Sequence, residues 1–398
     1  PDKNSNAREV LERLTKVPGY RTGSVRALLS DAIQRSDLER ADHLAQDLQM
    51  SQQVTFADLL LCLDFYRKLD QKKFSALLEK VKPVAARNTA DVASLIEWLN
   101  KNGLAAEALK WTDKLPPELV TVPPPAVAIA EAFAEEKNWS RLKRWTRSGS
   151  WGDAEFLRLA YQAYAARNAR QSAAEAEFDS LWHSADKLTV DHPEDEASLA
   201  RLAMKWSLTS EAKALWKRVV KYPPMRREAL DALSRLARAA NDLPELLSVA
   251  RQLHESSPRE TALTANYARL ALLLAPNTEE AQRAAKEAYE EAPNDLNAAL
   301  TYAFSLYALG RSAEGLEVLR KLPNEELREP HAAVYTAVLL LDNNEPQAAQ
   351  EFVEAAQRGP LYLEEKKLLD EALAKINVPS PSAAPSTPLP SPSPTAAP

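Results

Sequence analysis

Three arginines lie at a constant spacing in the second half of the chain. Arg201, Arg235 and Arg269 each open an Arg-Leu-Ala triplet, and successive members are 34 residues apart. A guanidinium group carries its N–H donors in a planar fork that matches a carboxylate. If the triplets occupy the same place in a repeated unit, their guanidinium groups form a ladder that suits acidic side chains or a terminal carboxylate.

The triplets also have a simpler interpretation. On a helix that faces a core, Leu and Ala would be the buried pair and arginine the solvated residue beside them. The spacing predicts where the three side chains lie relative to one another. It leaves open whether they bind a ligand.

The other residues of catalytic type do not form a recognised site. His183 and His192 lie in one neighbourhood with several aspartates, but no HExxH motif or helical i, i+4 pair accompanies them, which favours a polar loop over a metal site. The stretch "SGSWG" (148–152) does not match the GxSxG nucleophile pattern, and the sequence contains no GxGxxG or phosphate-binding loop motif. We therefore expect no enzymatic activity, no cofactor and no metal.

Aromatic residues and cysteine give little further chemistry. Trp139, Trp145 and Trp151 are six residues apart, and burial between helices is favoured over a shared aromatic patch. Cys62 is the only cysteine, so no disulfide can form within the chain and its thiol is expected to pack as a small apolar group.

The composition favours helices throughout. Of the 398 residues, 45% are hydrophobic and 7% aromatic, and only 8 are glycine. Ala and Leu dominate, while runs in which Val, Ile and Thr alternate with polar residues are almost absent, so the chain is predicted to be all-α. The formal net charge of −6 argues against a nucleic-acid partner, and no stretch is long and apolar enough to span a membrane.

Small residues recur with the same period as the arginines. Ala212, Leu246, Ala281, Gly315 and Ala349 follow one another at spacings of 34, 35, 34 and 34. This period predicts repeated pairs of antiparallel helices, stacked because no single pair buries its apolar face alone. Gly310, between two apolar stretches, is expected to leave the helix at positive φ and form the turn of one pair.

These positions resemble the tetratricopeptide repeat. Leu309, Gly310 and Gly315 match the turn and the small position of one repeat, and Ala281, Ala288 and Pro293 match another. "NGLAAEALKW" (102–111) fits as well, with Gly103 in the turn and Ala108 at the small position. The resemblance is clear over about 193–359 and weaker upstream, and the repeat after Pro293 ends early at Pro323.

The resemblance implies an α-solenoid whose first helices face a concave, peptide-binding surface. Nine residues would then lie on that surface as peptide-binding candidates: Arg201, Lys205, Arg235, Arg238, Asn266, Arg269, Phe304, Tyr307 and Tyr335. Some members of the family hold a terminal carboxylate with a clamp of Lys, Arg and Asn. The order of the residues here does not match that clamp.

About ten antiparallel hairpins are expected along the chain. The predicted divisions are a partial helix at 1–20, divergent hairpins at 21–120, irregular hairpins with longer connections at 121–192, the clear array at 193–359, a capping helix at 360–376 and a disordered tail at 377–398. The upstream helices are predicted at 22–35, 37–48, 53–69, 71–82, 89–102, 104–115, 124–136, 139–147, 153–167 and 170–187. Connections at 115–125 and 183–193 could act as hinges. The Pro- and Ser-rich tail is interpreted as a linker rather than an SH3-type ligand.

We predict a non-catalytic scaffold that binds a protein or peptide partner, possibly acidic or carboxylate-bearing, along the concave face. The alternative is a structural spacer for an N-terminal membrane or enzymatic module, since the sequence begins at Pro1 rather than Met and an upstream anchor is possible. The compartment is left open between a soluble cytoplasmic protein and a tethered or exported one. RNA binding, as in pentatricopeptide repeats, is disfavoured by the acidic charge.

Overall fold

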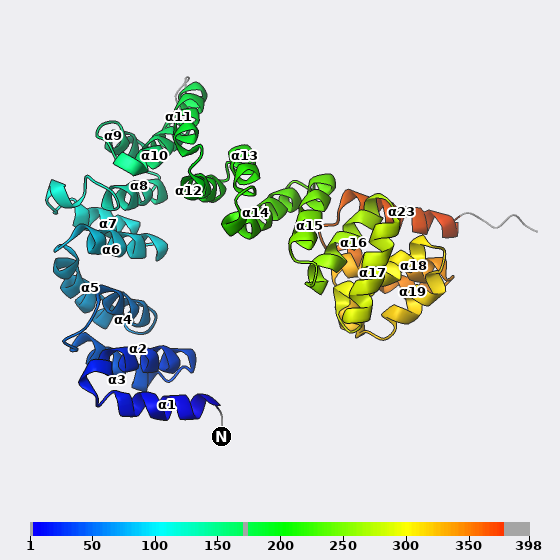
Figure 1. Cartoon of the computed structure of the whole chain (residues 1–398), viewed down its shortest axis with the longest axis horizontal. Coiled ribbons are helices and arrows are strands. Elements are labelled where there is room, and N and C mark those ends of the chain that lie inside the picture. Colours follow the sequence, from blue (N-terminus) through cyan, green and yellow to red (C-terminus); the bar gives the residue numbers. More distant parts are fainter. Residues whose placement is uncertain (1–2, 170–173, 378–398) are drawn as a thin grey trace, which may run out of the picture. The chain divides into compact units, whose positions relative to one another are not determined.

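The protein is all-α, as predicted from its composition. The computed structural model describes residues 3–169 and 174–377, and this part of the chain holds 23 α-helices, three short 3-10 helices and no strand (Figure 1). The chain divides into two compact units, unit 1 at Pro1–Asp195 and unit 2 at Glu196–Pro398. The tail predicted to be disordered lies outside the described residues except for Asn377.

In its described residues, unit 1 consists of one helix followed by five helical hairpins. The single helix is α1 (Lys3–Leu14). The hairpins are α2 (Pro18–Gln34) with α3 (Leu38–Gln49), α4 (Phe56–Leu69) with α5 (Gln71–Ala85), α6 (Thr89–Lys101) with α7 (Ala105–Thr112), α8 (Pro125–Glu135) with α9 (Trp139–Thr146), and α10 (Glu155–Asn168) with α11 (Ala174–Thr189). Each predicted upstream helix therefore has a counterpart in the structure.

The described part of unit 2 contains five more hairpins and one helix after them, and the first three residues of its first helix belong to unit 1. The hairpins are α12 (Pro193–Lys205) with α13 (Thr209–Val219), α14 (Arg226–Ala239) with α15 (Leu243–Ser256), α16 (Thr261–Leu274) with α17 (Glu279–Glu291), α18 (Leu296–Ala308) with α19 (Ser312–Leu319), and α21 (Pro330–Asp342) with α22 (Pro346–Gln357). The short α20 (Asn324–Leu327) follows Pro323, where the sequence indicated an early end of the repeat. The terminal helix is α23 (Leu363–Asn377).

The hairpins stack in the order of the sequence within each unit. We call the helix nearer the N-terminus of each hairpin its first helix. In unit 1 the first helices α6 and α8 pack together, and each of α3, α5, α7 and α9 packs against the first helix that follows it. In unit 2, α16 packs on α18 and α18 on α21. The described parts of both units are therefore α-solenoids of the expected kind, with ten hairpins in all.

The connection predicted at 183–193 is shorter than expected. α11 continues to Thr189, so only 190–192 separate it from Pro193, the first residue of α12. The connection at 115–125 is a real interruption, because it holds the 3-10 helix Pro117–Leu119 and a cis Pro123–Pro124 peptide bond before α8 begins.

A residue with positive φ forms the turn in seven hairpins. Gly310 has φ 73° and Gly103 has φ 69°, as their places in the sequence suggested. In the other five hairpins the same conformation is taken by residues with a side chain: Ser36, Lys137, Ser207, Asn241 and Asn344. In every one of these hairpins the small or apolar position of the second helix lies five residues after the turn residue, as Gly315 does after Gly310.

The small position exists because two helices approach there. A Cβ added at Gly315 would lie 2.7 Å from the carbonyl oxygen of Ala303 and 2.9 Å from Cδ2 of Leu339. Ala303 belongs to the first helix of the same hairpin and Leu339 to the first helix of the next one, so one residue serves both contacts. Side-chain bulk at this place would separate two hairpins.

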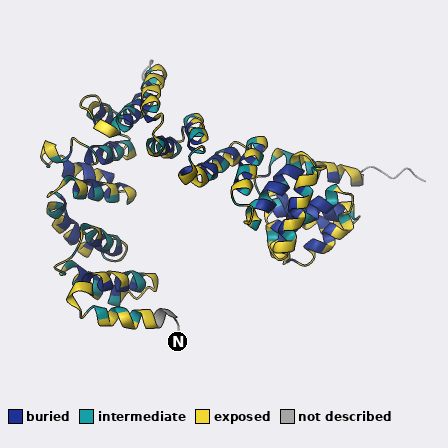
Figure 2. Ribbon diagram, viewed as in Figure 1, coloured by how far each residue is buried: buried dark blue, intermediate teal, exposed yellow. Residues whose placement is uncertain are grey.

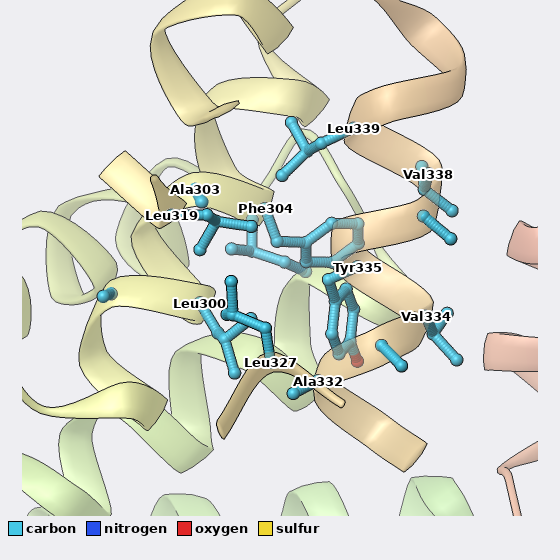
Figure 3. Packing of buried hydrophobic residues seen from close by; sticks show 14 of the residues in the cluster. Leu300, Ala303, Phe304, Leu319, Leu327, Ala332, Val334, Tyr335, Val338 and Leu339 are labelled. Carbon is cyan, nitrogen blue, oxygen red and sulfur yellow. The ribbon is translucent and has the colours of Figure 1, made fainter. Parts of the chain in front are cut away.

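The core of unit 2 lies between its first helices and the second helices beside them. Buried residues gather on the helix faces that meet one another (Figure 2). Phe304 of α18 and Tyr335 of α21 point toward each other at the centre, with Leu300, Leu319 and Leu339 around them (Figure 3).

The predicted capping helix is present as α23. It packs mainly on α21 and also touches α16, both of which are first helices. Its residues Leu369 and Ala372, and Leu361 just before it, are buried in the same cluster as Phe304 and Tyr335. The terminal helix of unit 2 therefore covers first helices, and this placement determines what remains exposed there.

Candidate functional site

Arg201 already holds a carboxylate of its own chain. Its Nε lies 2.6 Å from Oε1 of Glu228 and its Nη2 lies 2.7 Å from Oε2, which is the two-pronged geometry that a guanidinium fork favours. Hydrogen bonding from Arg201 holds the pKa of Glu228 below its ordinary value, and the charges of Arg201 and Arg235 add to the effect. Arg201 of α12 is thereby linked to the first helix of the next hairpin.

Arg235 and Arg238 are exposed on α14 and form no ion pair with a described residue. They are three residues apart, so their side chains leave the same side of the helix. The charge of Arg235 acts on Glu228, and the charge of Arg238 acts on Tyr362, where it opposes the rise that burial causes in the tyrosine's pKa. Lys205, near the end of α12, is exposed as well.

Arg269 is less accessible than the other two members of the ladder. It is partly buried on α16, and its Nη2 lies 3.5 Å from Oδ1 of Asn266, the other candidate on this helix. Its charge acts on Tyr335 and Tyr362. The equal spacing of the arginines thus places them on successive first helices in three different environments.

The aromatic candidates do not lie on an open surface. Phe304 is 3% exposed and Tyr335 is 1% exposed, and their ring centroids are 4.8 Å apart. Tyr307 is half-buried, and Nζ of Lys375 on α23 lies 5.9 Å from the centre of its ring. The expectation of exposed aromatic side chains is therefore corrected: neighbouring helices pack around Phe304 and Tyr335, and α23 covers Tyr335.

A buried carboxylate fastens α23 to α21. Glu365 is 0% exposed, and its Oε1 accepts a hydrogen bond of 3.0 Å from the hydroxyl of Tyr335. Its Oε2 lies 2.7 Å from Nδ1 of His331 and accepts from the backbone N–H of Tyr362 at 3.1 Å. Burial, followed by the charge of Glu365, raises the pKa of Tyr335 well above its ordinary value, so the phenol keeps the proton that it donates.

The sequence interpretation did not identify Glu365 and His331. The signal was present, since Glu365 lies four residues before Leu369 and seven before Ala372, and therefore on the apolar side of the terminal helix. A glutamate at such a position indicates a buried partner on the surface that the helix covers.

The other candidates found in the sequence do not gain a site. His183 and His192 are both exposed, and the described part of the chain contains no group of His, Cys, Asp and Glu that could hold a metal ion. Burial raises the pKa of the Cys62 thiol to about 12, so this cysteine is not a nucleophile near neutral pH.

The three tryptophans do not form one patch. Trp145 and Trp151 line a hollow of about 450 Å³ in unit 1 together with Phe133. Trp139 instead packs edge-on against Tyr164, with ring centroids 5.3 Å apart. Trp145 donates its indole N–H to the carbonyl of Ala126 at 3.0 Å, as expected of a tryptophan wedged between helices.

None of the helices in the described residues is both long enough and apolar enough to cross a membrane.

Three solved structures resemble the chain at low sequence identity. Yeast Tom70 is 12% identical, the match covers 94% of this chain and 93% of that chain, and the TM-score is 0.30. The Cut9 and Hcn1 hetero-tetramer of the APC/C is 13% identical over 89% of this chain and 75% of that chain, with a TM-score of 0.29. The TPR domain of P58(IPK) is 16% identical over 90% of this chain and 99% of that chain, with a TM-score of 0.23. TM-scores in this range support no conclusion about function.

No curated protein matches the chain by sequence.

The family model of the tetratricopeptide repeat matches residues 272–336, which run from the last three residues of α16 through α17 to α20 and the first half of α21. The same turn and the same small position recur in hairpins before and after this stretch, with Asn241 and Asn344 in place of Gly310. The chain therefore contains tetratricopeptide repeats over residues 272–336, within a longer series of helical hairpins that share their turn and spacing.

Proposed function

We propose that unit 2 is a non-catalytic protein-binding scaffold whose first helices α12 and α14 take an acidic or carboxylate-bearing segment of a partner. Arg235 and Arg238 would be its main anchors, and Lys205 and Arg201 would extend the positive surface onto α12. The observation that carries the proposal is that Arg235 and Arg238 are exposed side by side without an ion pair to a described residue.

Two further features support this choice of ligand. Arg201 on α12 already binds a carboxylate, because its guanidinium group donates two hydrogen bonds to Glu228. An exposed ion pair of this kind contributes little to stability, so the carboxylate of a partner can replace Glu228 at small cost. The family match adds only that proteins of this class carry helical repeats of a kind used to bind other proteins.

A charge-reversal experiment tests the proposal. The probe is a fluorescently labelled hexaglutamate peptide, and the variant is Arg235→Glu with Arg238→Glu in the full chain. We expect the double variant to bind the probe at least about tenfold more weakly, because two attractive contacts become repulsive. Binding of the wild-type chain should also weaken as salt is raised.

The matched control reverses the same number of charges elsewhere in unit 2. Arg259 lies in the loop before α16 and Arg283 on the second helix α17, and both are exposed and form no ion pair with a described residue. Arg259→Glu with Arg283→Glu should leave affinity within about twofold of wild type, since only the net charge changes. Equal losses in the two double variants, or no binding by the wild-type chain, would refute the proposed surface.

A further inference from the structure

α23 lies where the concave surface of the last hairpins was expected to receive a ligand. It packs on α21 and touches α16, and its Lys375 lies over the ring of Tyr307 on α18. Its apolar residues share one buried cluster with Phe304 and Tyr335. A segment of the chain itself therefore occupies this part of the surface.

The surface under α23 contains a carboxylate pocket. Two of the three donors to Glu365, the Tyr335 hydroxyl and the His331 ring, belong to α21 and not to the helix that carries the carboxylate. The charge of Arg269 acts on Tyr335 and on Tyr362, the residue before α23. A carboxylate is costly to bury unless donors surround it, and this pocket supplies them.

The occupant has a simple pattern. Glu365, Leu369 and Ala372 are spaced by four and three residues, which places them on one side of α23, and Leu361 is buried in the segment just before that helix. The surface thus takes an apolar stripe interrupted by one carboxylate at a fixed place.

Only one side of α23 is used in the fold. Lys366, Lys367, Asp370 and Glu371 are exposed on its other side. Within the described residues no further helix follows it, so its release would leave the stacking of the earlier hairpins intact. In contrast, α18 packs between hairpins on both sides and cannot leave without separating them.

We propose that α16, α18 and α21 form a helix-binding groove, that α23 is its internal occupant, and that its external ligand is an amphipathic helix of a partner protein. The partner helix carries a carboxylate followed by apolar residues four and seven positions later, as Glu365 is followed by Leu369 and Ala372, and a large apolar residue precedes the helix, as Leu361 does. This inference rests on the proposed function, that unit 2 binds protein segments, and it names the class of partner for the covered part of the surface.

The tether gives α23 an advantage over an external helix. Only residues 358–362 connect it to α22, so its effective concentration at the groove is high. The apparent affinity of a partner is reduced by the fraction of time for which the groove is open. Binding at this site is therefore self-limited, and any change that loosens α23 exposes the groove.

Hydrogen exchange on the full wild-type chain tests the inference without any mutation. The probe is a synthetic peptide with the sequence of 360–377. We expect the amides of α23 to exchange at least about tenfold faster than those of α21, because α23 opens alone. Excess peptide should protect α21 and speed exchange in α23, as expected of direct competition. Exchange in α23 as slow as in α21, with no effect of the peptide, would overturn the proposal.

Variants sharpen the same test. Leu369→Asp in the full chain should release α23 and raise the affinity for the labelled peptide at least about tenfold, because the competitor is removed. Ala374→Asp is the control, since this residue is exposed on the same helix and should leave affinity unchanged. A peptide with the change Glu365→Ala should bind at least about tenfold more weakly to the Leu369→Asp chain, because the donors on α21 lose their acceptor.

The outcomes separate this inference from the proposed function. If the 360–377 peptide binds and competes with α23 while hexaglutamate does not bind, only the proposed acidic surface on α12 and α14 fails. If hexaglutamate binds through Arg235 and Arg238 while the 360–377 peptide leaves exchange in α23 unchanged, only the groove fails. Should the Leu369→Asp chain not fold, the wild-type exchange measurement still decides.

Discussion

The first helices of unit 2 are used in two different ways. α14 carries Arg235 and Arg238 in solvent, whereas α21 buries Tyr335 beneath α23. Both helices belong to hairpins of the same period and have the same kind of turn, at Asn241 and Asn344. The repeat thus determines where a side chain lies on the stack, and the element that packs over it determines whether that side chain is exposed to solvent or buried in the fold.

We call α12 and α14 the open end of unit 2, and α18 and α21, which lie next to α23, the covered end. The two ends also bind carboxylates differently. Glu228 is exposed and held by the fork of Arg201, while Glu365 is buried among neutral or weakly basic donors. An exposed pair can exchange its partner with little loss, but a buried carboxylate must keep every donor it has. This difference leads to three predictions of decreasing size.

The largest effect is expected from truncating a side chain at the covered end. Tyr335→Ala should lower the free energy of opening of α18 and α21 by about 3–5 kcal/mol, because it leaves a cavity beside Phe304 and removes a donor to Glu365. Hydrogen exchange of the amides in α18 and α21 measures this quantity for unit 2 alone.

The matched change at the open end is Arg235→Ala. It should alter the free energy of opening of α14 by no more than about 0.5 kcal/mol, since the side chain is exposed and forms no ion pair with a described residue. Comparable losses in the two variants would show that the contrast between the two ends is wrong.

A second, smaller effect concerns the carboxylates themselves. Glu365→Ala should destabilise the packing of α23 and α21 by about 1–3 kcal/mol, because the Tyr335 hydroxyl and the Tyr362 N–H lose their acceptor. Glu228→Ala should cost about 1 kcal/mol or less, as is usual for an exposed pair. Exchange rates in α21 and α14, respectively, report the two losses.

Glu365→Gln serves as the control for this pair of variants. The amide retains an oxygen that can accept from Tyr335 and keeps the volume of the side chain. A loss that is as large for Glu365→Gln as for Glu365→Ala would mean that the negative charge matters more than the hydrogen bonds.

Much of the fold follows from local spacing. Ala281, Gly315 and Ala349 marked the close approaches between helices, and the contacts that a Cβ at Gly315 would make show why a small residue is needed there. Turns without glycine were harder to place. Ser207 and Lys137 adopt positive φ although nothing in their residue type requires it, so only the five-residue interval to the next small or apolar position identifies them.

The site was less predictable than the fold for a physical reason. The period placed Arg201, Arg235 and Arg269 on successive first helices, but their environments depend on residues outside the period. Glu228 reaches Arg201 from the next hairpin, and α23 covers Tyr335 from the end of the chain. An amphipathic pattern shows that a helix buries one side, and it does not show which surface receives that side.

The smallest effect concerns the titration of Glu228. Arg201 holds its pKa below the ordinary value of 4.5 mainly through hydrogen bonds, with the charge of Arg235 as a weaker cause. A carboxylate with a lowered pKa in the folded chain stabilises the fold above its ordinary pKa, and this contribution is lost as the pH falls through the folded value.

Arg201→Gln should therefore return the pKa of Glu228 toward 4.5 in an NMR titration, whereas Arg235→Gln should move it less. The stability difference between Arg201→Gln and wild type should be below about 1 kcal/mol near neutral pH and vanish in acid, because the pair is exposed. If the pKa of Glu228 shifts more in Arg235→Gln than in Arg201→Gln, Arg235 and not Arg201 is the main partner of this carboxylate. The assignment of Arg235 as the main anchor for a partner would then be wrong.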